Sequence, residues 1–217
     1  MKLHQILINQ TKKECVFCNP SKELVIERSK YFIIMFDPFA LMPGHLLLTS
    51  KDHYGCLGEI PEEMHEECDE LRKKWCSLLS IHFNTGVTRY EHGRAGHCIA
   101  RGIESRSCHH YHEHLLPAEL SLHVRLIDRF KSISYLEEIE IVNLYYKYHE
   151  YLLVSEFNGK KKFYIAKSDD VESHLLRTLS AEALGQSNLQ NWESYNSCEK
   201  MFIGKDILKL ATENILL

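Results

Sequence analysis

Short apolar runs separated by polar turns dominate the first half of the chain. Residues 22–36 hold two such runs, LVI and YFIIMF, on either side of ERSK, and this pattern predicts a hairpin of strands. The next segment, DPFALMPG (37–44), is rich in turn-forming residues, and HLLLTS (45–50) predicts a strand that leaves the turn. Residues 86–91 and 109–116 predict two further strands.

One segment of the first half has the period of a helix instead. Residues 61–80 begin with Pro61, which suits the first helical position, and Glu62 and Glu63 suit the first turn. Apolar residues then recur along one face, at Met64, Cys68, Leu71, Trp75, Leu78 and Leu79. A series of strands crossed by one helix indicates an α+β fold.

The second half has a less regular pattern. The pattern predicts a helix leading toward a strand over LEEIEIVNLYYKYHEYLL (136–153), and then a hairpin over FNGKKKFYIA with Asn158-Gly159 as its turn. A second helix is predicted over 171–184, after Asp169-Asp170 and before Gly185. The chain closes with an amphipathic segment over DILKLATENILL (206–217). Nothing between residues 118 and 150 has the composition of a flexible linker. We therefore predict one extended domain, with residues 118–217 packed on residues 1–117.

Composition narrows the class of protein and its surroundings. The net charge of −4 gives no reason to expect a nucleic acid as partner. The chain has no run of 18 apolar residues, so the sequence predicts no membrane span. The first residues, MKLHQILINQTKKEC, lack the apolar core of a signal peptide. Eight cysteines without an export signal favour a cytoplasmic location, with thiols that are free or bound to metal.

Histidine is unusually abundant, and four histidines are concentrated in SCHHYHEHLLP (107–117). If this segment is a strand, His110, His112 and His114 point to one face, with neighbours ~6.7 Å apart. Three imidazoles in a row suit an extended ligand such as a phosphate chain, and a neutral imidazole can attack phosphorus. A histidine-rich surface strand or an adventitious metal site is the alternative, and the regular alternation favours function.

The same residues resemble a known family. HYHEHLLP resembles the motif of the histidine-triad (HIT) family, His-φ-His-φ-His-φ-φ, in which φ is apolar. Four other segments resemble parts of this family: YFIIMFDPFALMPGHLLLTSKDH (31–53) its N-terminal half, CVFCNP (15–20) the Cys-x-x-Cys of many bacterial members, YEHG (90–93) the Phe-Glu-His-Gly of one subgroup, and, more weakly, SHLLRTLSAEALG (173–185) with Trp192 a C-terminal extension.

The resemblance implies a fold and an activity. It implies a HIT-like catalytic core over residues 1–117, with an antiparallel sheet of about five strands and packed helices, and an α/β extension over residues 118–217. HIT proteins are hydrolases and transferases that cleave at the α-phosphate of a nucleotide, and they usually form homodimers. The implied substrates are nucleoside phosphoramidates, nucleotide esters or dinucleoside polyphosphates. The alternatives are a zinc-stabilised nucleotide-binding module with little turnover, or a nucleotide phosphorylase or nucleotidyltransferase, although those often carry Gln where this chain has His114.

Residue roles follow from the same resemblance. His112 aligns with the nucleophile that forms a covalent nucleotidyl-histidine, and His114 and His45 align with groups that bind the phosphoryl oxygens. Ser107 aligns with a serine that donates a hydrogen bond to the phosphate or the leaving group. Asp37 aligns with the acid that holds the ribose hydroxyls, although Asp37 before Pro38 predicts only a turn when considered alone.

One position departs from the motif. Glu113 stands where the family prefers an apolar residue. On a strand it faces away from the triad, so it should not touch the reacting atoms. A buried carboxylate needs a partner, and we therefore expect either a nearby cation or exposure to solvent.

Cys15 and Cys18 predict a second site. A Cys-x-x-Cys pair supplies two thiolates to one tetrahedral metal, and the abundant imidazoles favour structural zinc over a redox pair or inert thiols. The resemblance implies His53 and His110 as the other two ligands. His110 would then be unavailable to phosphate, which leaves His45, His112 and His114 as the catalytic set. Four other donors compete for the metal: His92, His97, His109 and Cys108.

Several weaker candidates remain open. Arg177, in the helix predicted over 171–184, suits a phosphate, but an arginine on a helix is more often a solvated charge. Glu91 and His92 are candidates for the phosphate end of the site. The loop 94–106 carries Arg94, Arg101 and Arg106, and it is either a cover with positive charge or an ordinary solvated loop.

Overall fold

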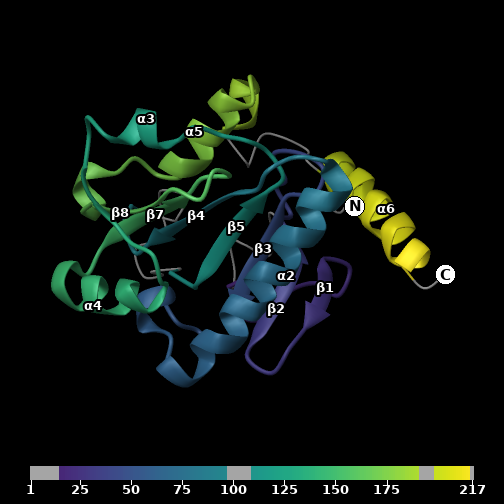
Figure 1. Ribbon diagram of the computed structural model, residues 1–217, viewed down its shortest axis with the longest axis horizontal. Coiled ribbons are helices and arrows are strands. Elements are labelled where there is room, and N and C mark those ends of the chain that lie inside the picture. Colours follow the sequence, from purple (N-terminus) through teal and green to yellow (C-terminus); the bar gives the residue numbers. More distant parts are fainter. Residues whose placement is uncertain (1–14, 97–108, 191–197, 216–217) are drawn as a thin grey trace.

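The computed structural model describes residues 15–96, 109–190 and 198–215 (Figure 1). Its strands form one sheet in the order β1-β2-β3-β5-β4-β7-β8-β6, and all neighbouring strands are antiparallel. The strands are β1 (Val25–Arg28), β2 (Phe32–Phe36), β3 (Leu46–Ser50), β4 (Thr88–Gly93), β5 (His112–Leu116), β6 (Lys131–Ser134), β7 (Tyr151–Ser155) and β8 (Lys161–Ile165). The predicted α+β class with an antiparallel sheet is confirmed, but the sheet has eight strands within the described residues and not about five.

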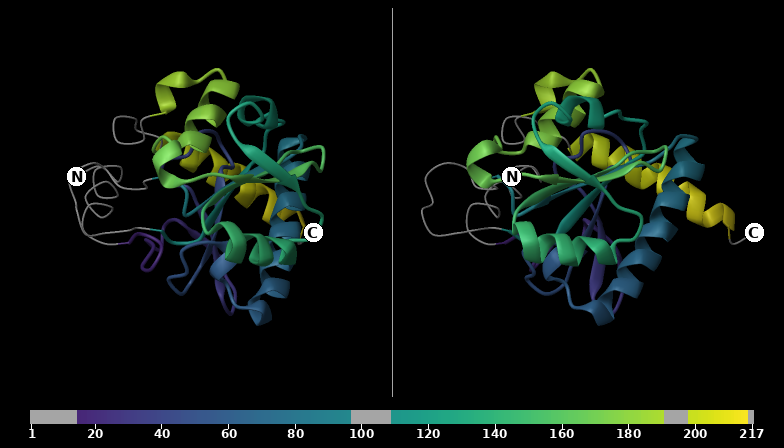
Figure 2. Two further views of the ribbon diagram at one scale, coloured as in Figure 1. Left: turned by 90° about the vertical axis from the view of Figure 1, so that its left-hand side faces the viewer. Right: turned by 60° about the vertical axis from the view of Figure 1, so that its left-hand side comes forward.

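The helices of the described part cover both faces of this sheet. They are α2 (His65–Phe83), α3 (His123–Leu126), α4 (Ile139–Tyr148), α5 (Leu175–Ala183) and α6 (Cys198–Ile215), with 3-10 turns at Leu57–Glu59, Glu62–Met64, Ser168–Asp170 and Ser187–Leu189. Figure 2 shows α3 and α5 on one side of the twisted sheet and α4 on the other. Two apolar cores result, one packed under α2 and α4 and one under α3 and α5. None of the helices in the described residues is long and apolar enough to cross a membrane.

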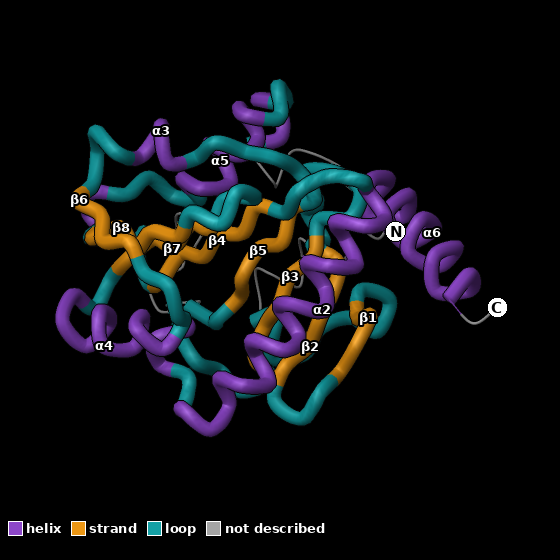
Figure 3. The backbone as a smooth tube through the Cα atoms, in the orientation of Figure 1, coloured by secondary structure: helices purple, strands orange, loops and turns teal. Residues whose placement is uncertain are grey.

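The sheet continues from the first half of the chain into the second. β4 pairs with β5 along one edge and with β7 along the other, so strands from before and after residue 117 share one sheet (Figure 3). β6, KSIS, was not predicted because it is a partly exposed edge strand with no apolar alternation. β7 was predicted only as the strand to which a helix leads, and it forms a hairpin with β8 around Gly159, whose φ is 81°.

Most of the predicted elements of the first half are confirmed. β1 and β2 form the expected hairpin, and β3 follows the turn-rich loop. The predicted helix 61–80 is α2, preceded by a 3-10 turn and ended by Asn84 in the left-handed conformation (φ 48°). The strand predicted over 109–116 starts only at His112. The Tyr111 N–H donates to the Tyr54 carbonyl (2.6 Å), outside the sheet, so His110 precedes the strand.

The helix predicted over 171–184 is shorter than expected. Asp169 and Asp170 do not cap it, because they lie in a separate 3-10 turn. His174 is left-handed (φ 60°), and the helix α5 runs from Leu175 to Ala183 after it. Gly185, at φ 67°, follows its end as predicted.

Candidate functional site

Three adjacent strands bring a carboxylate and two imidazoles to one place. Asp37 follows β2, His45 precedes β3, and His114 lies on β5, where it pairs with Leu47 of β3. The Asp37 N–H donates to the His45 carbonyl (3.1 Å), which extends the β2–β3 pairing to the site. The turn needs Gly44, because its φ is 79° and a side chain would meet the ring of Phe83.

The side chains of Asp37, His45 and His114 form one buried cluster. His45 Nε2 lies 2.9 Å from His114 Nδ1, and the Asp37 Oδ2 atom lies 3.3 Å from the first and 3.4 Å from the second. The other carboxylate oxygen accepts the Phe39 N–H (2.7 Å). Burial alone would raise the pKa of Asp37, but its imidazole and guanidinium neighbours hold this pKa well below its usual range. The carboxylate is therefore ionised and lies beside both histidines.

The backbone fixes the tautomers of these histidines. Leu41 donates its N–H to His45 Nδ1 (3.1 Å), so a neutral His45 carries its proton on Nε2. That proton is donated to His114 Nδ1, which leaves His114 with its own proton on Nε2. Burial lowers the pKa of both residues to about 4, so both are neutral at pH 7. His114 is thus set to donate a hydrogen bond from Nε2.

The same tautomers bear on metal binding by this cluster. The ligand atoms of Asp37, His45 and His114 lie within 4.8 Å of one another, which is close enough to hold a metal ion. His45 Nε2 must lose its proton to bind a metal, while Nδ1 already accepts the Leu41 N–H. That would leave an imidazolate, so the contacts favour a hydrogen-bonded network over a metal site.

His112 is the opposite tautomer, with its proton on Nδ1 and not on Nε2. Its Nδ1–H donates to the carbonyl of His110 (2.7 Å), so Nε2 carries the lone pair. Its ring stacks on Phe17, with centroids 4.5 Å apart. Burial, followed by the charge of His114, lowers the pKa of His112 to about 4. The result is a neutral, oriented imidazole whose Nε2 can act as a nucleophile.

Glu113 points to the opposite face, as the strand period predicts. It is only 8% exposed, and it accepts hydrogen bonds from Arg72 Nε of α2 (2.7 Å) and Arg89 Nη1 of β4 (2.6 Å). Two guanidinium groups therefore provide the nearby cation that was expected for Glu113. Arg89 also donates to Ser155 and Glu138, so the departure from the motif is part of a buried ionic network under α2.

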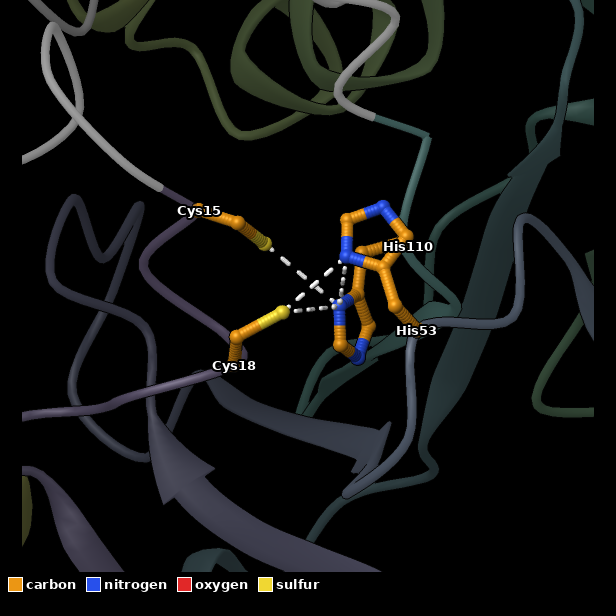
Figure 4. Close-up of side chains that lie close together, drawn as sticks. All are labelled: Cys15, Cys18, His53 and His110. Carbon is orange, nitrogen blue, oxygen red and sulfur yellow. Dashed lines mark hydrogen bonds between the residues drawn. The ribbon is translucent and has the colours of Figure 1, made fainter.

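A second cluster gathers the four predicted metal ligands (Figure 4). His53 Nδ1 lies 3.0 Å from Cys18 Sγ and 3.3 Å from His110 Nδ1. His110 Nδ1 also lies 3.4 Å from Cys15 Sγ and 3.5 Å from Cys18 Sγ. Ligand atoms around a tetrahedral ion with N and S ligands are roughly 3.3 to 3.8 Å apart. Three of these separations match that range, and the fourth, between Cys18 Sγ and His53 Nδ1, is shorter.

The hydrogen bonds around His110 also suit a metal. Its Nε2–H donates to the Ser50 carbonyl (2.9 Å), which leaves the Nδ1 lone pair directed at the sulfurs. Burial and the nearby Cys15 raise the pKa of Cys18 to about 11. Two thiols side by side resist deprotonation, and a bound cation would remove that resistance. The group Cys15, Cys18, His53 and His110 could therefore hold a metal ion.

Several residues of the site were not selected from the sequence. Tyr90 stacks on His114, with centroids 4.4 Å apart and rings 20° from parallel, and Phe17 stacks on His112. His174 precedes α5, and its pKa is lowered to about 4 by burial, then by Arg177 and His112. Only the strand period could have indicated Tyr90, because it places residue 90 on one face with residue 92.

The weaker candidates have separate outcomes. Glu91 does not share the histidine face, since neighbours on a strand alternate, and it accepts the Leu57 N–H (2.9 Å) on the α2 side. His92 does lie on the histidine face, where its Nε2 accepts the Leu176 N–H (3.2 Å). Arg177 is 5% exposed, so the interpretation as a solvated charge is wrong. Arg94 forms an ion pair with Glu59.

Other predictions concern residues outside the described part of the chain. They include the role of Ser107, the metal donors His97 and Cys108, Arg101 and Arg106 of the loop, and Trp192. These stay predictions.

Comparison with known proteins gives distant likenesses. No protein-family model and no curated protein matches the chain. Several of the solved structures that match are HIT family proteins. One from Bacillus anthracis is 17% identical and one from Bacillus subtilis is 18% identical; each match covers 49% of this chain and 74% of the other chain, with a TM-score of 0.38. The match to the yeast Ap4A phosphorylase Apa2, solved in complex with AMP, covers 82% of this chain and 80% of that chain, at 13% identity and a TM-score of 0.42. At these values no residue role is carried over from these proteins.

Proposed function

We propose that the protein is a nucleotide hydrolase or transferase that cleaves at an α-phosphate through a covalent nucleotidyl-histidine on His112. The observation that carries the proposal is the state of His112: Nδ1 donates to a backbone carbonyl, and Nε2 keeps its lone pair beside a second imidazole that presents an N–H. Phosphoryl transfer depends mainly on positioning and on neutralising charge, and this pair supplies both. The resemblance of HYHEHLLP to the HIT motif supports the same chemistry.

The reaction has two displacements at phosphorus. In the first, His112 Nε2 forms a bond to the α-phosphorus, and the leaving group departs with the electrons of the broken bond. The Nε2–H of His114 donates to a phosphoryl oxygen and stabilises the charge that develops there. In the second, water attacks phosphorus and releases a proton to solvent, the P–N bond breaks, and His112 recovers its lone pair. Asp37 and His45 hold His114 in position, and the predicted contact of Asp37 with ribose stays a proposal.

The covalent intermediate is the direct test. Protein mixed briefly with a panel of nucleotides labelled at the α-phosphate is quenched in base, and the peptide that carries the label is identified by mass spectrometry. A base-stable, acid-labile label on His112 supports the proposal. Complete turnover without such a label would remove the nucleotidyl-histidine from the mechanism.

Two alternatives use the same residues. A phosphorylase or nucleotidyltransferase would replace water by phosphate or by another acceptor in the second step, and product analysis with each acceptor separates these from a hydrolase. A metal-stabilised nucleotide-binding module with little turnover is favoured by the closed set of four metal ligands. It would exchange labelled nucleotide without a covalent label on His112.

We further propose that the metal is zinc with a structural role. The donor set of two sulfurs and two nitrogens is the one that zinc prefers, and it links the N-terminal segment to the residue that precedes the strand of His112. Bound zinc would neutralise the thiolates and fix His110, whose carbonyl accepts the Nδ1–H of His112.

Elemental analysis is expected to find about one zinc per chain after washing with a chelator. Cys15→Ser should lose this metal and lower the melting temperature, and activity should fall because His112 loses its orientation. Cys76→Ser, which changes a thiol of α2 outside the cluster, is the control and should keep the metal. Metal-free protein with unchanged melting and activity would contradict the zinc proposal.

We also propose that the protein is a homodimer, on the basis of the family resemblance. Light scattering at micromolar concentration is expected to give twice the mass of the chain. The mass of a single chain at the highest concentration tested would contradict this expectation, and it would indicate that residues 118–217 cover the surface through which HIT proteins pair.

A further inference from the structure

The N-terminal turn of α5 lies against the histidine face of the sheet. Leu176, the second residue of α5, donates its N–H to His92 Nε2 (3.2 Å), and Thr178 closes the first helical turn onto the His174 carbonyl (2.9 Å). Because His92, His112 and His114 alternate on two paired strands, they share this face. The Leu175 N–H donates to the Glu172 carbonyl (3.1 Å), so this turn favours an anion mainly through the partial positive charge of the helix N-terminus.

Arg177 lies in this turn and is buried with unused hydrogen-bonding capacity. One guanidinium nitrogen, Nη2, donates to the Leu189 carbonyl (3.2 Å), whereas Nε has no hydrogen-bond partner among the described residues. A buried donor without an acceptor is costly, so an acceptor is expected from a ligand. The charge of Arg177 acts on Asp37, His45 and His114, so the guanidinium lies on the side of the sheet that carries this cluster.

A second buried donor lies in the same region. The Tyr90 hydroxyl is near Ser180, whose own hydroxyl donates to the Leu176 carbonyl (2.7 Å), and no hydrogen bond of normal geometry joins Tyr90 to any described residue. Its ring lies on His114. The charge of Arg177 also acts on Tyr90, so the two groups lie in the same region.

Cationic and imidazole groups surround this region on several sides. His92 comes from β4, His112 and His114 from β5, His174 from the segment before α5, and Arg177 from α5 itself. Asp37 is the acid that the same contacts include. If Arg177 served only as a counterion to Asp37, its charge would be explained. The Arg177 Nε–H and the Tyr90 hydroxyl would still lack acceptors among the described residues.

We propose that Arg177 and the N-terminal turn of α5, together with His92 and His174, form a second anion subsite beside His112. The subsite binds the phosphoryl group next to the one that His112 attacks. This deepens the proposed function and rests on it: the substrates are compounds with two or more linked phosphates, such as dinucleoside polyphosphates, rather than phosphoramidates or simple esters. Residues 118–217 thereby contribute to substrate selection.

Binding of inorganic phosphates tests the subsite without any assumption about the base or about turnover. Isothermal titration calorimetry on the full-length protein compares pyrophosphate with orthophosphate. We expect pyrophosphate to bind the wild-type protein at least about tenfold more tightly. Arg177→Gln should weaken pyrophosphate about 10- to 100-fold, as the loss of a charge-assisted hydrogen bond predicts, and should change orthophosphate by less than about threefold. Arg125→Gln is the matched control, because Arg125 pairs with Glu182 of α5 on the exposed side and should change neither affinity.

The other outcomes decide against parts of the proposal. Equal weakening of both anions by Arg177→Gln would mean that Arg177 acts on the attacked phosphate or only on Asp37, and no weakening would remove the subsite. If melting curves show that Arg177→Gln does not fold, Arg177→Lys keeps the charge without the Nε–H, and unchanged pyrophosphate binding there overturns the proposal. A missing covalent label on His112, with pyrophosphate binding that still depends on Arg177, would refute the proposed function and leave the subsite.

Discussion

Replacing His112 with alanine is expected to lower kcat by at least about a thousandfold while the Kd for nucleotide changes by less than about tenfold. The nucleophile acts in the transition state and contributes little to binding the ground state, so the loss should appear in kcat. His45→Ala and His114→Ala should have smaller effects, because each removes part of the network that orients and stabilises the phosphoryl group but leaves the nucleophile. Steady-state kinetics with the best nucleotide of the panel, and equilibrium binding of its product, measure both quantities.

A matched control separates loss of the nucleophile from loss of a histidine. His82 lies in the last turn of α2, the helix that packs on the Glu113 face of the sheet, and His82→Ala should leave kcat within about twofold. Near wild-type turnover in His112→Ala would exclude this residue as the nucleophile. A large rise in Kd with unchanged kcat would instead assign His112 to substrate binding.

Glu113→Gln is expected to destabilise the fold by about 3 to 5 kcal/mol, because it leaves two buried guanidinium groups without their shared carboxylate. The measurement is the free energy of unfolding from urea titration. Glu182→Gln is the control: Glu182 pairs with Arg125 at 3.1 Å, but both side chains are more than a third exposed, so the loss should be under about 1 kcal/mol. Equal effects of the two changes would show that the buried network contributes no more than a surface pair.

The same carboxylate predicts how stability varies with pH. Burial would raise the pKa of Glu113, but Arg72 and Arg89 hold it below its ordinary value of 4.5. The unfolded chain therefore takes up the proton at a higher pH than the folded protein does. The stabilisation is fully present above about pH 4.5 and is lost as the pH falls through the lower pKa of the folded state. In Glu113→Gln this part of the acid dependence should be absent.

The sequence predicted those parts of the site that depend on strand alternation and on motif order. His112, His114 and Glu113 lie on the expected faces, because the strand period leaves no other arrangement. The ligands Cys15, Cys18, His53 and His110 come together from separate segments, and the resemblance had already grouped them. The partners of Glu113 could not be predicted, since Arg72 and Arg89 meet it only after α2 packs on this face of the sheet and β4 pairs with β5.

The second half of the chain resisted prediction for physical reasons. Asp169 and Asp170 are residues that often cap a helix, but they lie in a separate 3-10 turn and α5 begins only at Leu175. The start of the helix was therefore predicted wrongly, and the sequence could not show which side of the helix Arg177 turns toward the sheet. β6 has a single apolar residue, Ile133, because an edge strand buries little. Burial of Arg177 depends on contacts between α5 and β4, which are more than 80 residues apart, and local pattern contains no information on such contacts.

The position of β4 between β5 and β7 has a consequence for biosynthesis. A nascent chain that has left the ribosome only as far as residue 117 possesses every histidine of the triad, yet one edge of β4 still lacks its hydrogen-bonding neighbour. That edge offers its backbone to any extended chain nearby until Tyr151–Ser155 is translated and pairs with it. The histidine face of the sheet is also without α5 until still later, when residues 175–183 emerge. We therefore expect the chain to associate wrongly most readily in the interval before β7 pairs with β4, and a truncation at residue 117 would make that interval permanent.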